Sequence, residues 1–521
     1  MGLKPYFGLR GNAILRAATF LVVCPTFTCY GYNMSVAGGL LTLPAFNDQF
    51  PRMDTFNTSG ALEKENSTIQ GTVIALYTVG GIFGALSCVY LGDLLGRKKV
   101  IFWTNFITII GCILMGTSFD FAQFIVARLI LGLGIGGYVA TVPVWQSEIT
   151  PADKRGSNVV TDGIFVGAGV TIALWIDLGF FFVKDNSVSW RFPLVFPVVL
   201  CAIAMAAIPF LPESPRWLIK MGRIEEARMV MSALFNVEPD SEMITESIHQ
   251  VETTLAVCGN TNWTAMFTNG EQRLFHRAYL AATGQLFQQM CGVNLITYYA
   301  TSIFQQYLHM DAVKSRILAA AMGLMQPLGG YLAYYTIDSL GRRPLMLWCA
   351  GAMAVCMAVL AGCTSKSAED NTAALVVAVV ALYAFQFIFT AGYSGLTFLY
   401  AAEMAPLQVR AAVSAVSTAT VWVFNFLLAE VTPVGFSSIG SNYYIIFAVI
   451  NAIIVPSVYF FFPETKGRSL EEIDEIFAQS KSIFDPPRVA RRMQTIQAVR
   501  PDSSENASGN DTDHYKEDVK V

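Results

Sequence analysis

Four amide side chains gather in one otherwise apolar stretch of the chain. The sequence QLFQQMCGVNLITYY carries Gln285, Gln288, Gln289 and Asn294. Gln285, Gln288 and Gly292 recur at steps of three and four residues, so on a helix part of the set shares one face. An amide buried without a hydrogen-bond partner costs roughly 2–7 kcal/mol. These side chains therefore face either a cavity that takes a polar ligand or another helix to which they hydrogen-bond.

Three charged motifs occur twice in the same order. GDLLGRKK recurs as IDSLGRRP, WQSEITPADKRG as LYAAEMAPLQVRA, and LPESPRWL as FPETKGRSL. The offsets between matching residues are nearly constant, which indicates two homologous halves. In so apolar a chain, two halves are typical of a transporter whose halves move about a central site.

The charged residues of these motifs could form a network at one side of each half. They are Asp93, Arg97, Glu148, Arg155, Glu213 and Arg216 in the first copy, and Asp338, Arg342, Arg343, Glu403, Arg410 and Glu464 in the second. An exposed ion pair contributes only about 0–1 kcal/mol. Several partly buried pairs could clamp that side shut and bias a two-state equilibrium. The alternative is a positively charged loop without pairing.

Twelve apolar stretches are long enough to cross a bilayer, which takes about 20 helical residues. Their approximate limits are 16–41, 70–91, 99–118, 121–146, 158–182, 190–210, 275–303, 315–337, 345–364, 373–399, 408–431 and 442–462. They predict an all-α membrane protein of twelve transmembrane helices in two six-helix bundles, 16–210 and 275–462. The segment 1–15 precedes them, a polar linker with short helices (211–274) joins them, and a tail (463–521) follows, disordered from about 485.

The composition excludes several other classes of protein. Of 521 residues, 54% are hydrophobic and 14% are charged, whereas a soluble domain has about 25% charged residues. The net charge of −4 provides no basic surface for nucleic acid. The ten cysteines and four histidines form no motif with metal-ligand spacing. We therefore expect no enzyme, no metal and no cofactor.

Lysine and arginine are concentrated in the connections that follow the even-numbered stretches. By the positive-inside rule these connections, the linker and both termini are cytoplasmic. The opposite loop at 42–69 then lies outside and holds two glycosylation sequons, at Asn57 and Asn66. We expect a multi-pass protein, most simply of the plasma membrane.

The repeated motifs, together with Arg128 and the following GLGIGG, QQMCGVNLITYY and PETKGRSLEE, resemble the sugar porter family of the major facilitator superfamily across nearly the whole chain. The fungal hexose and monosaccharide transporters are especially similar. The resemblance implies alternating-access transport of a monosaccharide, either passive or coupled to protons. It also implies that a single chain is the functional unit.

A sugar is neutral and rich in hydroxyls, so amides, hydroxyls and aromatic faces bind it. The resemblance implies a sugar-binding role for Gln288, Gln289 and Asn294, and an outer-gate role for Tyr298. By register it adds Gln326, Phe398, Trp422 and Asn425. Phe398 stands where the family has a tryptophan, after a stretch that has lost the family's prolines.

The position that couples sugar to protons in the family holds Asn33 here, in GYNMSVAGG. An amide does not titrate in the physiological range, whereas a carboxyl group can. With Arg128 retained, Asn33 favours facilitated diffusion. Asp162, near the predicted start of 158–182, is expected to cap that helix, or else to be a relocated proton site; Asp177 and Glu430 are further acids in the apolar part.

The alternatives are a proton-coupled symporter of a hexose, pentose, polyol, quinate or disaccharide, and a sugar sensor. A charged substrate such as quinate needs a cation in the cavity, and the sequence offers only Arg128. Sugar sensors of this kind have a very long tail, whereas the tail here is modest. A neutral monosaccharide is therefore the favoured substrate.

Overall fold

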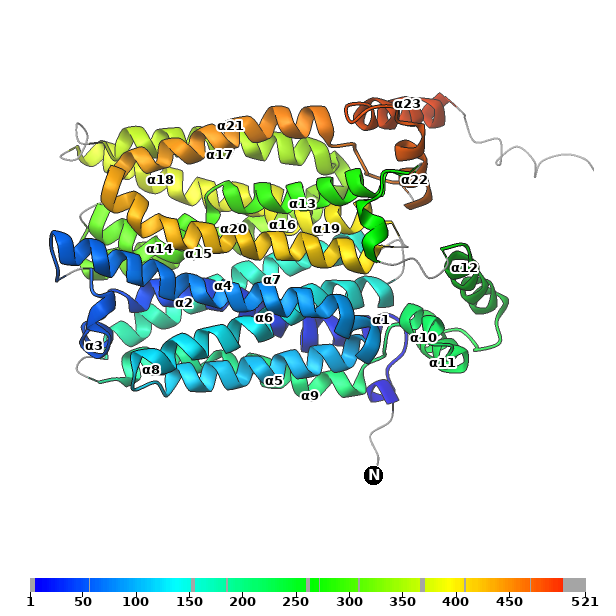
Figure 1. Ribbon diagram of the computed structural model, residues 1–521, viewed down its shortest axis with the longest axis horizontal. Coiled ribbons are helices and arrows are strands. Elements are labelled where there is room, and N and C mark those ends of the chain that lie inside the picture. The colour runs from blue at the N-terminus through cyan, green and yellow to red at the C-terminus, as the bar shows by residue number, and fades with distance from the viewer. Residues whose placement is uncertain are drawn as a thin grey trace, which may run out of the picture.

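The computed structural model describes residues 5–55, 57–150, 155–183, 186–258, 263–270, 272–307, 310–365, 371–406, 409–468 and 470–499. Within these ranges every regular element is a helix, and the long helices lie side by side along one axis (Figure 1). The predicted all-α fold is therefore confirmed.

The first half contains the helices of the first six predicted crossings. They are α1 (Asn12–Ala18), η2 (Thr19–Val23) and α2 (Cys24–Leu40) in one crossing, then α4 (Ala61–Leu95), α5 (Arg97–Gly116), α6 (Phe121–Ile149), α7 (Arg155–Phe181), and finally α8 (Val188–Val195) with α9 (Pro197–Ala207) and η5 (Ile208–Phe210). A short helix, α3 (Pro44–Gln49), follows α2 at one end of the molecule. We call that end the α3 side.

The second half repeats this arrangement. Its helices are α13 (Leu274–Met290) with α14 (Val293–Ser302), α15 (Ala312–Gly323) with α16 (Met325–Leu340), α17 (Arg342–Cys363), α18 (Thr372–Phe389) with η8 (Thr390–Ser394) and α19 (Leu396–Met404), α20 (Arg410–Ile439) and α21 (Tyr443–Phe461). The break between α13 and α14 falls at Gly292, whose φ of 102° is a conformation that favours glycine. The break at η8 is a π-turn and contains no proline.

The connecting helices gather at the opposite end, which we call the linker side (Figure 1). The linker forms α10 (Pro215–Lys220), α11 (Ile224–Phe235) and α12 (Glu242–Cys258), and the tail forms α22 (Leu470–Gln479) and α23 (Pro486–Val499). The short linker helices match the expectation from the sequence.

Ten helical stretches of the described chain are long and apolar enough to cross a membrane. One of them, Ala412–Phe461, contains both α20 and α21. The pair α13–α14 is not among the ten, because the break at Gly292 leaves α13 with 17 residues and α14 with 10, each too short to be counted alone. Counting α20 and α21 separately and adding α13–α14 gives the twelve crossings expected from the sequence.

Close helix packing inside the first half depends on glycine. A Cβ atom added to Gly132 of α6 would lie 1.8 Å from the carbonyl oxygen of Tyr77 on α4. One added to Gly136 would lie 2.1 Å from the carbonyl oxygen of Gly81. Small residues let membrane helices approach until their backbones touch. The GLGIGG sequence is therefore a packing surface for α4.

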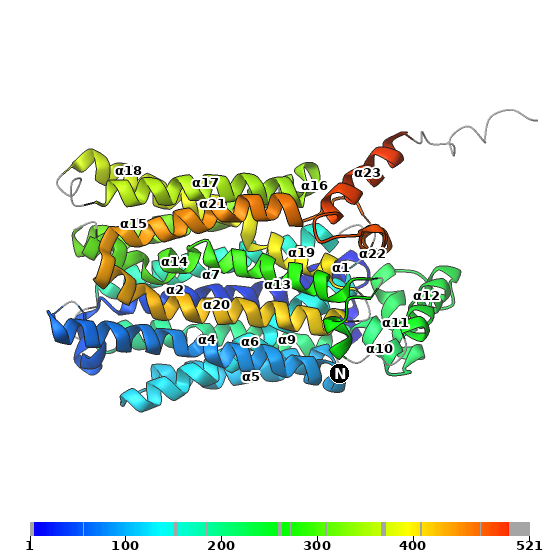
Figure 2. The same ribbon diagram turned by 45° about the horizontal axis from the view of Figure 1, so that its top comes forward.

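The halves meet where α4 packs against α20, α7 against α15 and α16, and α2 against α14. Figures 1 and 2 show these helices crossing the middle of the molecule, while α5 and α17 lie toward its edges. A site between the halves therefore lies among or next to these contacting helices.

The tail corrects one prediction. Disorder was expected from about residue 485, but α23 is helical from Pro486 to Val499. Its Ala490 is 1% exposed and accepts a hydrogen bond from Arg468, and the ring of Phe484 lies 4.9 Å from that of Phe461. The polar composition of the tail concealed these few contacts with α21 and with the segment that follows it. Residues 500–521 lie outside the described residues.

Candidate functional site

A small cavity of about 30 Å³ lies at the centre of the molecule, between the two halves. The first half lines it with Tyr30, Met34, Val166 and Val170. The second half lines it with Gln288, Gln289, Val293, Asn294, Thr297, Gln326, Phe389, Ser394 and Phe398. Amide and hydroxyl groups thus come almost entirely from the second half, and the first half contributes apolar surface and one phenol.

The amides of α13 and α14 form a continuous hydrogen-bonded chain. Asn294 donates to Oε1 of Gln289, and Nε2 of Gln289 donates to Oε1 of Gln288 at 3.1 Å. Nε2 of Gln288 then donates to the carbonyl oxygens of Ser394, at 2.8 Å, and Tyr393, at 3.3 Å. The carbonyl groups exposed by the π-turn of η8 are therefore satisfied by a cavity side chain. The side-chain oxygen of Asn294 has no partner among the described residues.

Gln326 belongs to a second polar group, which includes a residue that the sequence reading missed. Its Nε2 donates to Oε1 of Gln386 at 3.0 Å, and Nε2 of Gln386 donates to the hydroxyl of Thr297 at 3.2 Å. Gln386 is 1% exposed. The only signal in the sequence was a single amide in the apolar run ALYAFQFIF. The group fixes the orientation of the Gln326 amide at the cavity wall.

Tyr298 follows the cavity-lining Thr297 on α14 and lies in a contact between the halves, which we call the closure. Its hydroxyl lies 2.5 Å from that of Tyr77 on α4 and donates to Oδ1 of Asn425 at 2.6 Å. A Cβ added to Gly38 of α2 would lie 2.1 Å from the carbonyl oxygen of Tyr298. Helices α2, α4, α14 and α20 therefore meet here without space between them.

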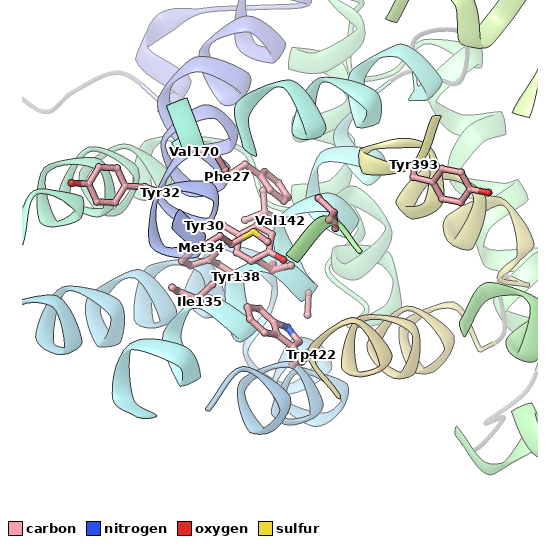
Figure 3. Close-up of a cluster of buried hydrophobic side chains, with 14 of the residues drawn as sticks. Phe27, Tyr30, Tyr32, Met34, Ile135, Tyr138, Val142, Val170, Tyr393 and Trp422 are labelled. Atoms are coloured by element: carbon pink, nitrogen blue, oxygen red, sulfur yellow. The ribbon is translucent and has the colours of Figure 1, made fainter. Parts of the chain in front are cut away.

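Trp422 and Asn425 lie beside this closure. The Trp422 ring is 0% exposed, with its centroid 5.5 Å from that of Tyr30 and 5.9 Å from that of Tyr77. Figure 3 shows Trp422 near Tyr30. Nε1 of Trp422 and Nδ2 of Asn425 have no hydrogen-bond partner among the described residues. Two donors are thus free, while Phe398 contributes its ring directly to the cavity.

The structure places Asn33 and Arg128 with different partners. Nδ2 of Asn33 donates to the carbonyl oxygen of Cys29 at 2.9 Å. Arg128 donates to the carbonyl oxygen of Ile74 at 2.9 Å, and its guanidinium carbon lies 5.2 Å from the ring centroid of Tyr77. Among the described residues no carboxylate pairs with Arg128.

Asp162 corrects another prediction. Capping was expected, but α7 is already helical at Arg155, so Asp162 lies about two turns inside the helix. It is 2% exposed and faces Gln146 of α6. Neither carboxylate oxygen makes a direct hydrogen bond within the described chain. Asp162 also lies outside the residues that line the cavity.

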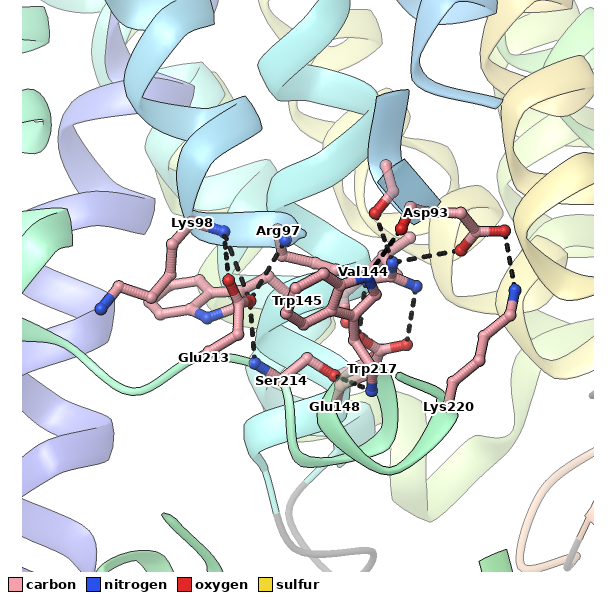
Figure 4. Close-up of polar contacts among 12 residues, drawn as sticks. Asp93, Arg97, Lys98, Val144, Trp145, Glu148, Glu213, Ser214, Trp217 and Lys220 are labelled. Atoms are coloured by element: carbon pink, nitrogen blue, oxygen red, sulfur yellow. Dashed lines mark hydrogen bonds and ion pairs between the residues drawn. The ribbon is translucent and has the colours of Figure 1, made fainter. Parts of the chain in front are cut away.

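On the linker side, the charged motifs of the first half form one network, which we call the first latch (Figure 4). Arg97 pairs with Glu148 at 3.1 Å and with Asp93 at 3.4 Å, and Lys220 of α10 reaches Asp93 at 2.8 Å. The Glu213 carboxylate accepts hydrogen bonds from the backbone N–H groups of Arg97 and Lys98. An anion thus lies at the N-terminus of α5, where the helix dipole favours it.

The second half repeats these contacts in a second latch. Arg342 pairs with Glu403 at 3.1 Å and with Asp338 at 3.0 Å. The Glu464 carboxylate accepts from the backbone N–H groups of Arg342 and Arg343 at 3.0 Å each, at the N-terminus of α17. The Arg343 side chain donates to the carbonyl oxygen of Tyr459 at 2.6 Å. Matching residues of the two motifs therefore occupy matching positions.

The remaining residues of the predicted network behave differently. Arg216 forms no ion pair with the described residues, and the side chains of Arg155 and Arg410 lie outside the described part of the chain. Each ion pair found in the latches joins elements of one half, or that half and the linker. No described ion pair joins the two halves on this side.

The two sequons differ in accessibility. Asn57 is exposed, with its side chain bonded to Asp54. Asn66 is 3% exposed inside α4, and its Nδ2 donates to the carbonyl oxygen of Asp54 at 2.7 Å. A glycan on that nitrogen does not fit this fold, so of the two predicted sequons only Asn57 is accessible in the described structure. The sequence motif does not reveal that α4 extends beyond its apolar part.

Comparisons with known proteins agree with this geometry. Residues 18–477 match the family described as "Sugar (and other) transporter". The sugar transporter STL1 of Saccharomyces cerevisiae is 34% identical over 98% of this chain and 90% of its own. The low-affinity glucose transporter HXT3 of the same yeast is 29% identical over 78% of this chain and 73% of its own.

A solved structure has the same fold. The proton:xylose symporter XylE bound to 6-bromo-6-deoxy-D-glucose superimposes with a TM-score of 0.75 at 20% identity. The match covers 90% of this chain and 100% of that one. This chain and that symporter therefore share one fold.

Proposed function

The chain belongs to the sugar transporter family of the major facilitator superfamily, and from this premise we propose that it carries a monosaccharide by facilitated diffusion. A hexose is the first candidate substrate, since a relative at 29% identity is named as a glucose transporter. The halves would open alternately toward the two sides of the membrane around the central cavity.

The observation that carries the proposal is the polar lining of that cavity. Gln288, Gln289 and Asn294 present amides, Gln326 presents a further one, and Phe398 presents a ring. Neutral donors and acceptors next to an aromatic face suit the hydroxyls and the apolar face of a sugar ring. No charged side chain lines the cavity in the described chain, which favours a neutral substrate.

A bound sugar would replace hydrogen bonds that the cavity amides already make with one another and with the backbone. The chain from Asn294 to Gln288 already satisfies most of its own amides. The oxygen of Asn294 is free at the cavity wall, whereas Nε1 of Trp422 and Nδ2 of Asn425 are free beside the closure and do not line the cavity. A sugar hydroxyl can pair with the Asn294 oxygen first, and Tyr298 then acts as the gate.

Facilitated diffusion is supported by the surroundings of Asn33. Its amide bonds to a backbone carbonyl, and Arg128 bonds to another carbonyl and lies near aromatic rings. These partners hold the guanidinium but carry no negative charge, and the Asn33 amide does not titrate in the physiological range. Among the described residues no carboxylate pairs with Arg128 to carry a coupled proton at this position.

We further propose that the linker side is cytoplasmic and that the protein lies in the plasma membrane as a single-chain transporter. The basic residues Arg97, Lys98, Lys99, Arg342 and Arg343 all lie at the linker-side ends of α5 and α17. This distribution follows the positive-inside rule. The exposed Asn57 on the other side is then an extracellular position.

The substrate assignment is tested by uptake of labelled glucose into cells expressing the chain, with pentose, polyol, quinate and disaccharide as competitors. Gln289→Ala and Asn294→Ala should each raise the half-saturation concentration about fivefold or more, because each removes hydrogen bonds worth about 1 kcal/mol apiece. Asn105→Ala is the matched control, because Asn105 is a buried amide that bonds only to its own helix. Unchanged affinity in both cavity variants would reject the site.

The mode of transport needs a separate experiment. Uptake is followed to equilibrium with and without a protonophore, in the unchanged protein and in Asn33→Asp and Asp162→Asn. Facilitated diffusion predicts equal internal and external sugar concentrations in both conditions. Accumulation that collapses with the protonophore would reject it, and loss of that accumulation in Asp162→Asn would assign the coupled proton to Asp162.

A further inference from the structure

Two buried groups of opposite charge face each other where the halves close on the α3 side. Arg316 of α15 belongs to the second half and is 2% exposed. Asp177 of α7 belongs to the first half and is 4% exposed. The two side chains interact electrostatically but form no ion pair within 4 Å. The cavity and the latches include neither residue.

Arg316 is held by the other half. Its Nη2 donates to the carbonyl oxygen of Thr42 at 3.2 Å and also to the Thr42 hydroxyl. Its guanidinium carbon lies 3.9 Å from the ring centroid of Phe181. Thr42 and Phe181 both belong to the first half, so these contacts exist only while the halves are together on this side. The Arg316 guanidinium therefore keeps the Thr42 carbonyl oxygen and the Phe181 ring as partners whether or not Asp177 is charged.

Asp177 has no such partners. Neither of its oxygens makes a hydrogen bond with the described residues. A Cβ added to Gly39 of α2 would lie 2.2 Å from Oδ2 of Asp177, so the carboxylate lies directly against the backbone of α2. Helix α2 belongs to the same half as Asp177, whereas α15, which packs against α7 and carries Arg316, belongs to the other half. Closing the halves therefore removes the remaining water from this carboxylate and returns no hydrogen bond. Such burial favours the protonated form of an acid.

The other charged and titratable groups around α7 do not remove the preference of the buried Asp177 for its protonated form. Arg316 on α15 and Tyr32 on α2 interact with Asp177, and the Tyr32 hydroxyl is engaged by the carbonyl oxygen of Pro193. Arg191 on α8 lies against Phe119 and Trp190. The acids of the other elements that contact α7 are Glu148 on α6, Asp338 on α16 and Glu403 on α19, and all three lie in the latches at the opposite end.

We propose that Asp177 is a proton-binding site that takes up a proton when the transporter closes on the α3 side. A proton from the outer solution joins a carboxylate oxygen on closure and leaves to the same solution on opening. The proton never crosses the membrane, so it drives no accumulation of sugar. External acid therefore holds the outer side closed and lowers the apparent affinity for external sugar.

The proposal rests on the orientation and transport function proposed above, and external pH provides the test. Half-saturation for uptake is measured in cells at about pH 5 and about pH 7.5 outside. In the unchanged protein it should rise about threefold or more on acidification, because only the open fraction binds external sugar. A proton symporter would show the opposite trend, with faster uptake in acid.

The key variant is Asp177→Asn, which keeps the size of the side chain and mimics the protonated form. Its half-saturation should be high at both pH values and should not depend on pH. Asp162→Asn is the matched control, because it replaces the other buried carboxylate of α7 that lacks a direct hydrogen bond, and it should keep the pH dependence. A pH effect that survives in Asp177→Asn, or that disappears in Asp162→Asn, would overturn the proposal.

A second measurement needs no substrate and so separates this proposal from the proposed function. One spin label is attached at the position of Val188 and one at that of Ile439. Both residues are 44% exposed and lie at the α3-side ends of α8 and α20. The distance between the labels reports closure directly. Acid should increase the closed population in the unchanged protein and leave it constant in Asp177→Asn. If the closed population of the unchanged protein does not change with pH, the proposal is overturned even if sugar transport is confirmed.

Discussion

The latches on the linker side and the closure on the α3 side hold the molecule together in different ways. Each latch joins elements of one half through buried ion pairs, such as Arg97–Glu148 and Arg342–Glu403, both at 3.1 Å. The closure joins the two halves through Tyr298 with Tyr77 and through Arg316 with Thr42. Strong contacts therefore make each half rigid, while weaker, mostly neutral contacts lie where the halves must separate.

This comparison revises the clamp suggested by the sequence. The repeated motifs do form a network on one side of each half, as expected. Their described ion pairs do not cross between the halves, so they do not by themselves hold the linker side shut. We interpret them as fixing the ends of α5 and α17 against their own bundles, so that each half can move as one body.

The largest effect should come from breaking a latch. Arg97→Ala or Arg342→Ala leaves a carboxylate in a nearly buried site without its partner, which costs about 3–5 kcal/mol. The variants should show a strongly lowered thermal midpoint in detergent. Lys220→Ala is the control, because the Lys220–Asp93 pair is exposed and contributes about 0–1 kcal/mol. Equal losses in all three variants would contradict the view of the latches as buried structural pairs.

A somewhat smaller effect is expected at the glycine before α5. Gly96 has φ 84° and ψ 167°, a conformation that costs any other residue about 1–3 kcal/mol. A Cβ there would also lie 2.9 Å from Oε2 of Glu213. Gly96→Ala should therefore lower the thermal midpoint clearly, as should Gly341→Ala, where φ is 97° and the neighbour is Glu464.

Gly92→Ala is the matched control for these glycine variants. Gly92 lies one turn earlier, within α4, and nothing would lie within 4 Å of its Cβ. Alanine is the better helix former by about 0.5–1 kcal/mol, so this variant should be neutral or slightly more stable. A loss at Gly92 equal to that at Gly96 would show that the backbone conformation is not the cause.

Variants of the closure should change the ratio of open to closed forms rather than the thermal midpoint. Tyr298→Phe weakens the contact with Tyr77, the hydrogen bond of Tyr298 that joins the two halves and is worth about 1 kcal/mol, so the open population on the α3 side should rise about fivefold. Tyr299→Phe is the control, because the Tyr299 hydroxyl donates to Ala429 within the same half. The spin-label distance across the α3 side measures both, and equal shifts would reject the assignment of Tyr298 to the closure.

The smallest expected effect is a pH dependence in the first latch. Burial raises the pKa of Glu213, although backbone N–H groups oppose the shift. A raised pKa means that the folded protein binds the proton more tightly than the unfolded chain does. The resulting stabilisation is complete below the ordinary pKa and is lost as the pH rises through the raised value.

Glu213→Gln removes this titration. The thermal midpoint of the unchanged protein, relative to Glu213→Gln, should therefore fall as the pH rises from about 4 toward neutrality. Lys466→Gln is the control. The Lys466 side chain lies beside the second latch and bonds only to the carbonyl oxygen of Ser339, so this variant should keep the pH dependence of the unchanged protein. A difference between Glu213→Gln and the unchanged protein that does not vary with pH would contradict burial as the cause of the raised pKa.

The sequence by itself determined the features that depend on local pattern. The apolar stretches predicted the helices, and the repeated charges predicted two matching networks, since both signals lie within short segments. The amides of QLFQQMCGVNLITYY predicted a polar surface inside an apolar helix, and Gln288, Gln289 and Asn294 do line the central cavity. Their role in binding sugar stays a prediction.

Only the tertiary structure decided which distant residues meet. Gln386 joins Gln326, and Arg316 contacts Thr42, although neither pair has any local signal. Asn66 is buried because α4 extends past its apolar part, and α23 forms because Phe484 and Ala490 find contacts with other parts of the second half. The burial of Asp177 depends on packing between segments more than a hundred residues apart, and periodicity along one segment carries no information about that packing.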